Sequence, residues 1–104
     1  MKVELLYFDG CPSWENGLKN LETALQEEGI TASVEMVKVK DDQDAALLKF
    51  LGSPSFRVDG AELWAEERKA YALSCRVYPT PEGMKGWPTV KMLREKLHRQ
   101  EEIK

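Results

Sequence analysis

The alternation of apolar and polar side chains predicts a strand followed by a helix at the start of the chain. Residues 3–8 form an almost continuous apolar run, which is typical of a strand buried on both faces. A stripe with helical spacing follows, made of Trp14, Leu18, Leu21 and Leu25. Pro12 suits the first turn of this helix, and Gly29 suits its C-terminal end.

The next segments predict a second strand and a short helix. Residues 32–39 alternate well enough for a strand, so the chain is expected to begin with a right-handed βαβ unit. Asp41 or Asp42 is a suitable N-cap for a short helix. The apolar residues assigned to this helix are Ala45, Leu47, Leu48 and Leu51.

The second half predicts a hairpin, an irregular insertion and a last helix. Asp59-Gly60 joins two short apolar segments, 56–58 and 61–63, which favours a hairpin. Residues 64–87 are rich in Pro and Gly and are expected to be irregular, with a helical piece over residues 64–71. Pro88 then opens a helix with its inward face formed by Val90, Leu93 and Leu97.

Composition narrows the functional classes. A chain of 104 residues forms one domain, so we assign 1–104 to a single unit. Its net charge of −3 argues against general binding of nucleic acid, which needs concentrated Lys and Arg. No segment is long and apolar enough to span a membrane, and no signal peptide is visible at the N-terminus. We therefore expect a cytoplasmic location with no membrane partner.

Cys11 is the residue that points most directly to chemistry. It lies where the first strand ends at Asp9-Gly10 and the first helix begins. Unpaired N–H groups and the helix dipole favour a thiolate there, and such positions lower the ordinary thiol pKa of about 8.5. The plainer interpretation is an inert, half-buried thiol. Asp9 either tunes this thiol or serves the turn.

Cys75 has three interpretations: an inert buried residue, half of a redox pair, or a metal ligand. A lone Arg76 beside it either stabilises a thiolate or is simply solvated. His98, the only histidine, lies in a charged segment and is expected to be exposed, which leaves no Cys–His pair. A structural zinc site needs four Cys or His ligands and this chain has three, so no structural zinc is expected, and no cofactor is expected either.

The order strand, helix, strand, helix, hairpin, helix resembles the thioredoxin-like superfamily, in its short, glutaredoxin-sized bacterial form. Two motifs carry the resemblance. Cys11-Pro12-Ser13-Trp14 stands where that family has Cys-x-x-Cys, and Ser53-Pro54-Ser55 stands where it has a cis-proline. The implied fold is an α/β domain with a central mixed four-stranded sheet flanked by helices and an insertion at 64–87.

The resemblance also implies a set of functional residues. Cys11 is the nucleophile, Pro54 is cis, and the backbone at Ser53 contacts a thiol-bearing ligand. Together with Ser53 and Pro54, the motif residues Pro12, Ser13 and Trp14 are assigned to substrate binding, although Trp14 also fits the core stripe. The implied activity is thiol–disulfide exchange with a protein or a small-molecule thiol or disulfide.

The departure from the family lies at Trp14, which replaces the second cysteine. A tryptophan cannot resolve a mixed disulfide, so Cys11 works as a single thiol or another thiol resolves it. Cys75 is the only candidate. The implied topology starts the segment after residue 63 near Cys11, and a disulfide would require a Cα–Cα distance of about 4.4–6.8 Å.

Two other functional classes stay open. Two thiolates suit a soft metal such as mercury, and the set Asp9, Cys11 and Cys75 is similar to bacterial organomercurial lyases. The third class is a non-catalytic interaction module that keeps the fold without its chemistry. The oligomeric state is also open, monomer or dimer, with Trp64, Trp87 or Tyr78 as candidates for a dimer surface.

Overall fold

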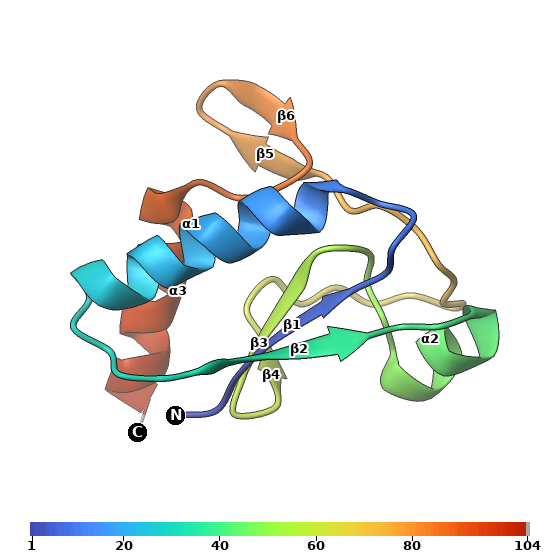
Figure 1. The fold of residues 1–104 in the computed structure, drawn as a ribbon, viewed down its shortest axis with the longest axis horizontal. Helices are drawn as coiled ribbons and strands as arrows, with labels where there is room; N and C mark the ends of the chain where they lie inside the picture. The colour runs from blue at the N-terminus through green and yellow to red at the C-terminus, as the bar shows by residue number, and fades with distance from the viewer. Residues whose placement is uncertain (104) are drawn as a thin grey trace.

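The computed structural model describes residues 1–103, which fold into a mixed α/β structure with three helices (Figure 1). The elements in chain order are β1 (Val3–Tyr7), α1 (Ser13–Glu27), β2 (Val34–Lys38), α2 (Asp42–Leu48), β3 (Ser55–Val58), β4 (Ala61–Glu62), β5 (Tyr78–Thr80), β6 (Gly83–Lys85) and α3 (Val90–Ile103). None of the helices within residues 1–103 has the length and apolar character needed to cross a membrane.

Four strands form a mixed sheet in the order β2-β1-β3-β4, so the predicted mixed four-stranded sheet is confirmed. β1 runs parallel to β2, with Val3 opposite Val34. It runs antiparallel to β3, with Leu5 opposite Phe56. β3 then turns at Asp59-Gly60 into the short antiparallel β4, where Asp59 and Gly60 both have positive φ. β1 therefore lies inside the sheet, which explains its apolar run.

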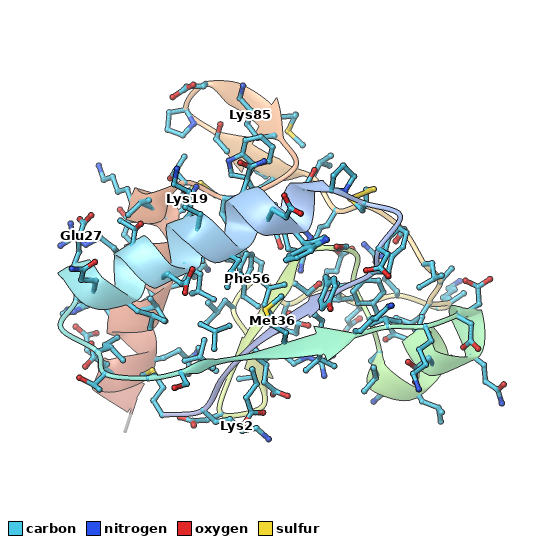
Figure 2. The ribbon with its side chains drawn as sticks, viewed as in Figure 1. Lys2, Lys19, Glu27, Met36, Phe56 and Lys85 are labelled. Carbon is cyan, nitrogen blue, oxygen red and sulfur yellow. A yellow bond between two sulfur atoms is a disulfide. The ribbon has the colours of Figure 1, made fainter. Side chains whose placement is uncertain are left out.

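The helices lie at different places around the sheet, and α2 is beyond the end of β2 (Figure 1). α1 and α3 pack on one face, where Phe56 points from β3 towards α1 (Figure 2). This larger core cluster consists of Val3, Leu5, Leu21, Ala24, Leu25, Phe56, Val58, Leu63, Tyr78, Leu93 and Leu97. On the other face, a smaller core cluster joins α2 and the chain after it to the sheet; it consists of Leu6, Val39, Ala45 and Phe50. Burial on both faces holds β1 at the centre.

α2 is shorter than its apolar pattern predicts. Asp41 is its N-cap, and the Asp41 carboxylate accepts a hydrogen bond from the Asp44 N–H at 2.7 Å. The helix ends at Leu48 because Lys49 adopts the left-handed conformation, with φ 53°. Leu51 therefore lies beyond the helix in the core, and Leu47 is 78% exposed instead of facing inward.

The predicted helix over 64–71 is wrong, because this stretch has no helical turn. The carbonyl oxygen of Trp64 accepts a hydrogen bond from the Arg76 guanidinium, whereas in a helix it would bond to a backbone N–H four residues on. The Trp64 ring packs on Tyr78, with ring centroids 5.2 Å apart. Tertiary contacts therefore replace the local hydrogen bonds of a helix.

The insertion also contains a hairpin that the sequence did not predict. β5 and β6 pair antiparallel through a turn at Pro81-Glu82, β6 begins at Gly83 with φ 107°, and the hairpin projects beyond α1 (Figure 1). Tyr78, at the start of β5, is 1% exposed. It is therefore removed from the candidates for a dimer surface, whereas Trp64 and Trp87 are half-buried.

Candidate functional site

Cys11 lies between the end of β1 and the first turn of α1. Its N–H donates a hydrogen bond to the carbonyl oxygen of Phe8 at 3.3 Å, which closes the Asp9-Gly10 turn. The turn is tight, because a Cβ added at Gly10 would lie 2.6 Å from the Phe8 ring. This geometry delivers the Cys11 side chain inward, and the residue is only 1% exposed.

Cys11 and Cys75 form a disulfide, with their Cα atoms 5.9 Å apart and a sequence separation of 64. Neither cysteine is free. The separation lies within the range in which a disulfide can form without backbone movement. The two ends differ in burial, because Cys11 is buried whereas Cys75 is exposed. The structure thus brings together the two thiols that lie far apart in sequence.

Pro54 lies beside this pair. The Ser53–Pro54 peptide bond is cis, and both residues are buried. The Sγ of Cys11 is 3.6 Å from the carbonyl oxygen of Ser53. Gly17 of α1 leaves the room that the Pro54 ring occupies, since a Cβ at Gly17 would lie 2.9 Å from Pro54 Cγ. The first helix and the proline loop therefore meet next to the sulfur.

A segment that we call the strap, residues 73–78, runs along the proline loop and carries Cys75. Ser53 and Cys75 form a parallel β-bridge. The N–H of Ser53 donates to the Ser74 carbonyl at 2.8 Å, and the N–H of Arg76 donates to the Ser53 carbonyl at 3.0 Å. The backbone groups that the resemblance assigns to ligand binding are therefore occupied by the chain itself.

Buried side chains anchor the strap on both sides of Cys75. The Tyr78 hydroxyl donates to the Pro54 carbonyl. Arg76 is buried, lies 3.5 Å from the Glu66 carboxylate and 4.0 Å from that of Glu62, and donates to a backbone carbonyl. The interpretation of Arg76 as a solvated residue is therefore wrong. Gly52 permits the close approach, because an added Cβ would lie 2.9 Å from Arg76 Cβ.

Burial shapes the electrostatics of these anchors. Loss of solvent raises the pKa of Glu62, and the hydrogen bond that its carboxylate accepts from Arg57 at 3.0 Å partly offsets this effect. Burial also raises the pKa of the Tyr78 hydroxyl. Both raised pKa values mean that negative charge is disfavoured in the buried region beneath the strap. The guanidinium of Arg76 places a positive charge in this same region.

Asp9 is directed towards a lysine. Its carboxylate forms an ion pair with the Lys38 ammonium at 2.6 Å, and this hydrogen bond raises the pKa of Lys38. Asp9 itself is exposed. A role in the turn and in this ion pair therefore accounts for Asp9 without a contact to the thiol.

The other motif residues surround the cysteine with different roles. Pro12 is exposed and is the N-cap residue of α1. Ser13 lies against the base of the hairpin, since a Cβ at Gly86 would lie 2.5 Å from the Ser13 Oγ. Trp14 is half-buried and packs on Tyr7, with ring centroids 4.7 Å apart. These contacts fix the start of α1 beside Cys11.

His98 belongs to a different part of the surface, on α3. Its side chain is 63% exposed, and its ring nitrogens lie 3.5 Å from Glu28 and 3.0 Å from Glu102. Within residues 1–103, the one group of three side chains close enough to share a metal ion is Glu28, His98 and Glu101. Among the residues that the structure describes, the cysteine pair therefore has no third Cys, His, Asp or Glu ligand close by.

Sequence reasoning missed the glycines and the buried anchors around the pair. Gly17 interrupts a helix one turn before the buried Leu21, and that position was the available signal for a close contact. The contacts that Gly52, Arg76 and Tyr78 make gave no local signal, because they arise from packing between segments far apart in sequence. Searches of protein-family models, curated proteins and solved structures find no match to this chain.

Proposed function

We propose that this protein catalyses thiol–disulfide exchange through Cys11 and Cys75 on a thioredoxin-like domain. The observation that carries the proposal is the disulfide between the two residues, placed beside a cis-proline at a strand–helix junction. The order β2-β1-β3-β4, with helices on both faces, supports the thioredoxin-like topology that the sequence motifs imply.

The exchange proceeds in two displacements. The Cys11 thiolate attacks one sulfur of a substrate disulfide, forms a mixed disulfide and releases the first substrate thiolate. The Cys75 thiolate then attacks the Cys11 sulfur, which forms the Cys11–Cys75 disulfide and releases the second substrate thiolate. The protein loses two electrons, the substrate gains them, and the released thiolates take protons from water. Cys75 thereby supplies the thiol that is missing at position 14.

The start of α1 favours the first displacement. The helix has 15 residues, and its first N–H groups and dipole stabilise a thiolate on the preceding residues. Pro12, Ser13 and Trp14 hold this helix end in place, and Ser53 and Pro54 form the opposite wall. The cytoplasmic location expected from the sequence fits a disulfide that forms during turnover, since that compartment keeps thiols reduced.

Reduction of a disulfide substrate by the protein tests the proposal. With insulin as the substrate and a small dithiol as the electron source, we expect Cys11→Ser to abolish the rate above background. Cys75→Ser is the matched control: it keeps the nucleophile but accumulates a mixed disulfide on Cys11, which mass spectrometry detects. A Cys11→Ser variant as active as the wild type would exclude Cys11 from its proposed role.

The juxtaposition of the two sulfurs also favours a second candidate, capture of a soft metal ion. After reduction, two thiolates this close suit linear coordination of Hg²⁺. Titration of the reduced protein with mercuric ion then yields a tight one-to-one complex that either Cys→Ser variant loses. Independent, weak reaction at each thiol would contradict this function.

The third candidate is a non-catalytic interaction module. The occupied backbone groups of Ser53 favour it, because no external chain can pair there while the strap is in place. In the reduced protein this candidate predicts that Cys11 reacts with iodoacetamide only near pH 8.5, as an ordinary thiol does. The exchange mechanism predicts reaction at distinctly lower pH.

A further inference from the structure

We infer that reducing thiols enter this site at Cys75, so that Cys75 carries the external mixed disulfide and Cys11 is the leaving group. This inference rests on the proposed function, because it assigns the step that regenerates the reduced pair. It reverses the order that the Cys-Pro-Ser-Trp motif predicts, in which the motif cysteine meets the external thiol.

The first step of the argument is access. Thiol–disulfide exchange needs an attacking thiolate to reach one of the two sulfurs. Cys11 is 1% exposed, beneath the strap and beside the Ser53 carbonyl. Cys75 is exposed, and the next-but-one residue, Val77, is 59% exposed. A thiol from solvent therefore meets the Cys75 end of the disulfide first.

The second step is the stability of the strap. In the oxidised protein, hydrogen bonds reinforce the disulfide: Leu73 N–H donates to the Asp42 carboxylate at 2.9 Å, and two backbone bonds tie the strap to Ser53. On the other side of Cys75, the Tyr78 hydroxyl is bonded to the Pro54 carbonyl. While the disulfide is intact, the cover over Cys11 is therefore held at both ends, and attack at Cys11 in this state requires it to open.

The third step is the leaving group. Exchange is faster when the displaced sulfur is the better stabilised thiolate. Attack at Cys75 displaces Cys11, which lies at the N-terminal end of α1, where the helix dipole favours negative charge. Attack at Cys11 would instead displace Cys75, which lies on an extended segment. Access and leaving-group stability thus select the same sulfur.

The regeneration step is then fully specified. A thiolate of a small reducing thiol attacks the Cys75 sulfur, the Cys11–Cys75 bond breaks, and Cys11 leaves as a thiolate. A second reducing thiolate attacks the mixed disulfide at the external sulfur, which releases Cys75 and forms the oxidised reductant. Two electrons pass from the two thiols to the protein, and protons from water neutralise the thiolates according to pH.

Mapping of the first adduct tests this assignment. Oxidised wild-type protein is mixed with reduced glutathione as the probe, quenched in acid at successive times, alkylated in denaturant and digested with trypsin. We expect glutathione on the peptide that contains Cys75 and the alkyl group on Cys11, in about tenfold excess over the opposite pattern at the earliest times. Glutathione mainly on Cys11 would overturn the inference but leave exchange through the pair intact.

The dependence of the reduction rate on urea provides a second readout. If the thiol attacks exposed Cys75, the rate stays nearly constant at urea concentrations below the unfolding transition. A rate that rises steeply with urea would mean that the strap must open, and would overturn the inference. Absence of any glutathione adduct, or of a disulfide in the oxidised protein, would reject both this assignment and the proposed function.

Discussion

The hydroxyl of Tyr78 donates a hydrogen bond to the carbonyl oxygen of Pro54, across 24 residues of sequence. Tyr78 is fully buried, and its ring also contacts Phe56 and Trp64. The bond joins the end of the strap to the cis-proline loop. It therefore links the position of Cys75 to the wall of the candidate site.

Tyr78→Phe is expected to lower the free energy of unfolding by about 1–2 kcal/mol, because it leaves a buried carbonyl without its partner while the ring packing is kept. Urea denaturation of the oxidised proteins at pH 7 measures the change. Tyr71→Phe is the matched control, since Tyr71 is only half-buried. Equal stability of the two variants would contradict a structural role for the Tyr78 hydroxyl.

Alkaline pH is expected to remove this stabilisation. Burial raises the pKa of Tyr78 above that of an exposed tyrosine, about 10. Above pH 10 the unfolded chain loses the phenolic proton before the folded chain does, so the free energy of unfolding falls as pH rises. The difference between wild type and Tyr78→Phe should shrink over the same range. A difference that grows with pH would contradict the raised pKa.

Loss of the disulfide is expected to cost about 2–4 kcal/mol of stability, because the cross-link closes a long loop and restricts the unfolded chain. Cys75→Ala should therefore unfold at lower urea than the oxidised wild type. Wild type treated with a reductant is the control, and it should unfold at the same urea concentration as Cys75→Ala. If reduction leaves the wild-type transition unchanged, the disulfide does not hold the strap in solution.

Two arginines that both form ion pairs are expected to differ in their contribution to stability. Arg76→Met removes a buried charge beside Glu62 and Glu66 and should cost about 3 kcal/mol. Arg94→Met removes only surface pairs with Glu27 and Glu28 and should cost much less, because solvent screens these pairs. Thermal or urea unfolding of both variants compares them, and similar costs would contradict the burial of Arg76.

Gly17→Ala is expected to destabilise the protein, although alanine in a helix interior is about 1 kcal/mol better than glycine. The new Cβ would lie 2.9 Å from the Pro54 ring and 3.2 Å from Phe56, and overpacking of this kind costs about 1–3 kcal/mol. The exposed neighbour provides the control, since Asn16→Ala should be neutral or slightly stabilising. A Gly17→Ala variant more stable than the wild type would contradict this prediction, because it would show that the proline loop shifts at little cost in free energy.

Local patterns predicted most of the regular elements. The apolar run before Asp9, the stripe along α1, the Asp41 cap and the Asp59-Gly60 turn all use interactions between residues close in sequence. These patterns can be recognised in a single sequence because they depend only on residue spacing and side-chain type. The predicted helix over 64–71 failed for the opposite reason, since its backbone groups bond to distant side chains.

The sequence by itself determined the strand–helix junction that holds Cys11, because turn chemistry and helix periodicity are local properties. Only the tertiary structure decided that Cys75, 64 positions further along the chain, lies next to Cys11. It also decided that the strap pairs with Ser53 and that Arg76 and Tyr78 are buried anchors. The physical reason is that these contacts join segments with no fixed spacing. Their geometry follows from how the helices and the insertion pack around the sheet.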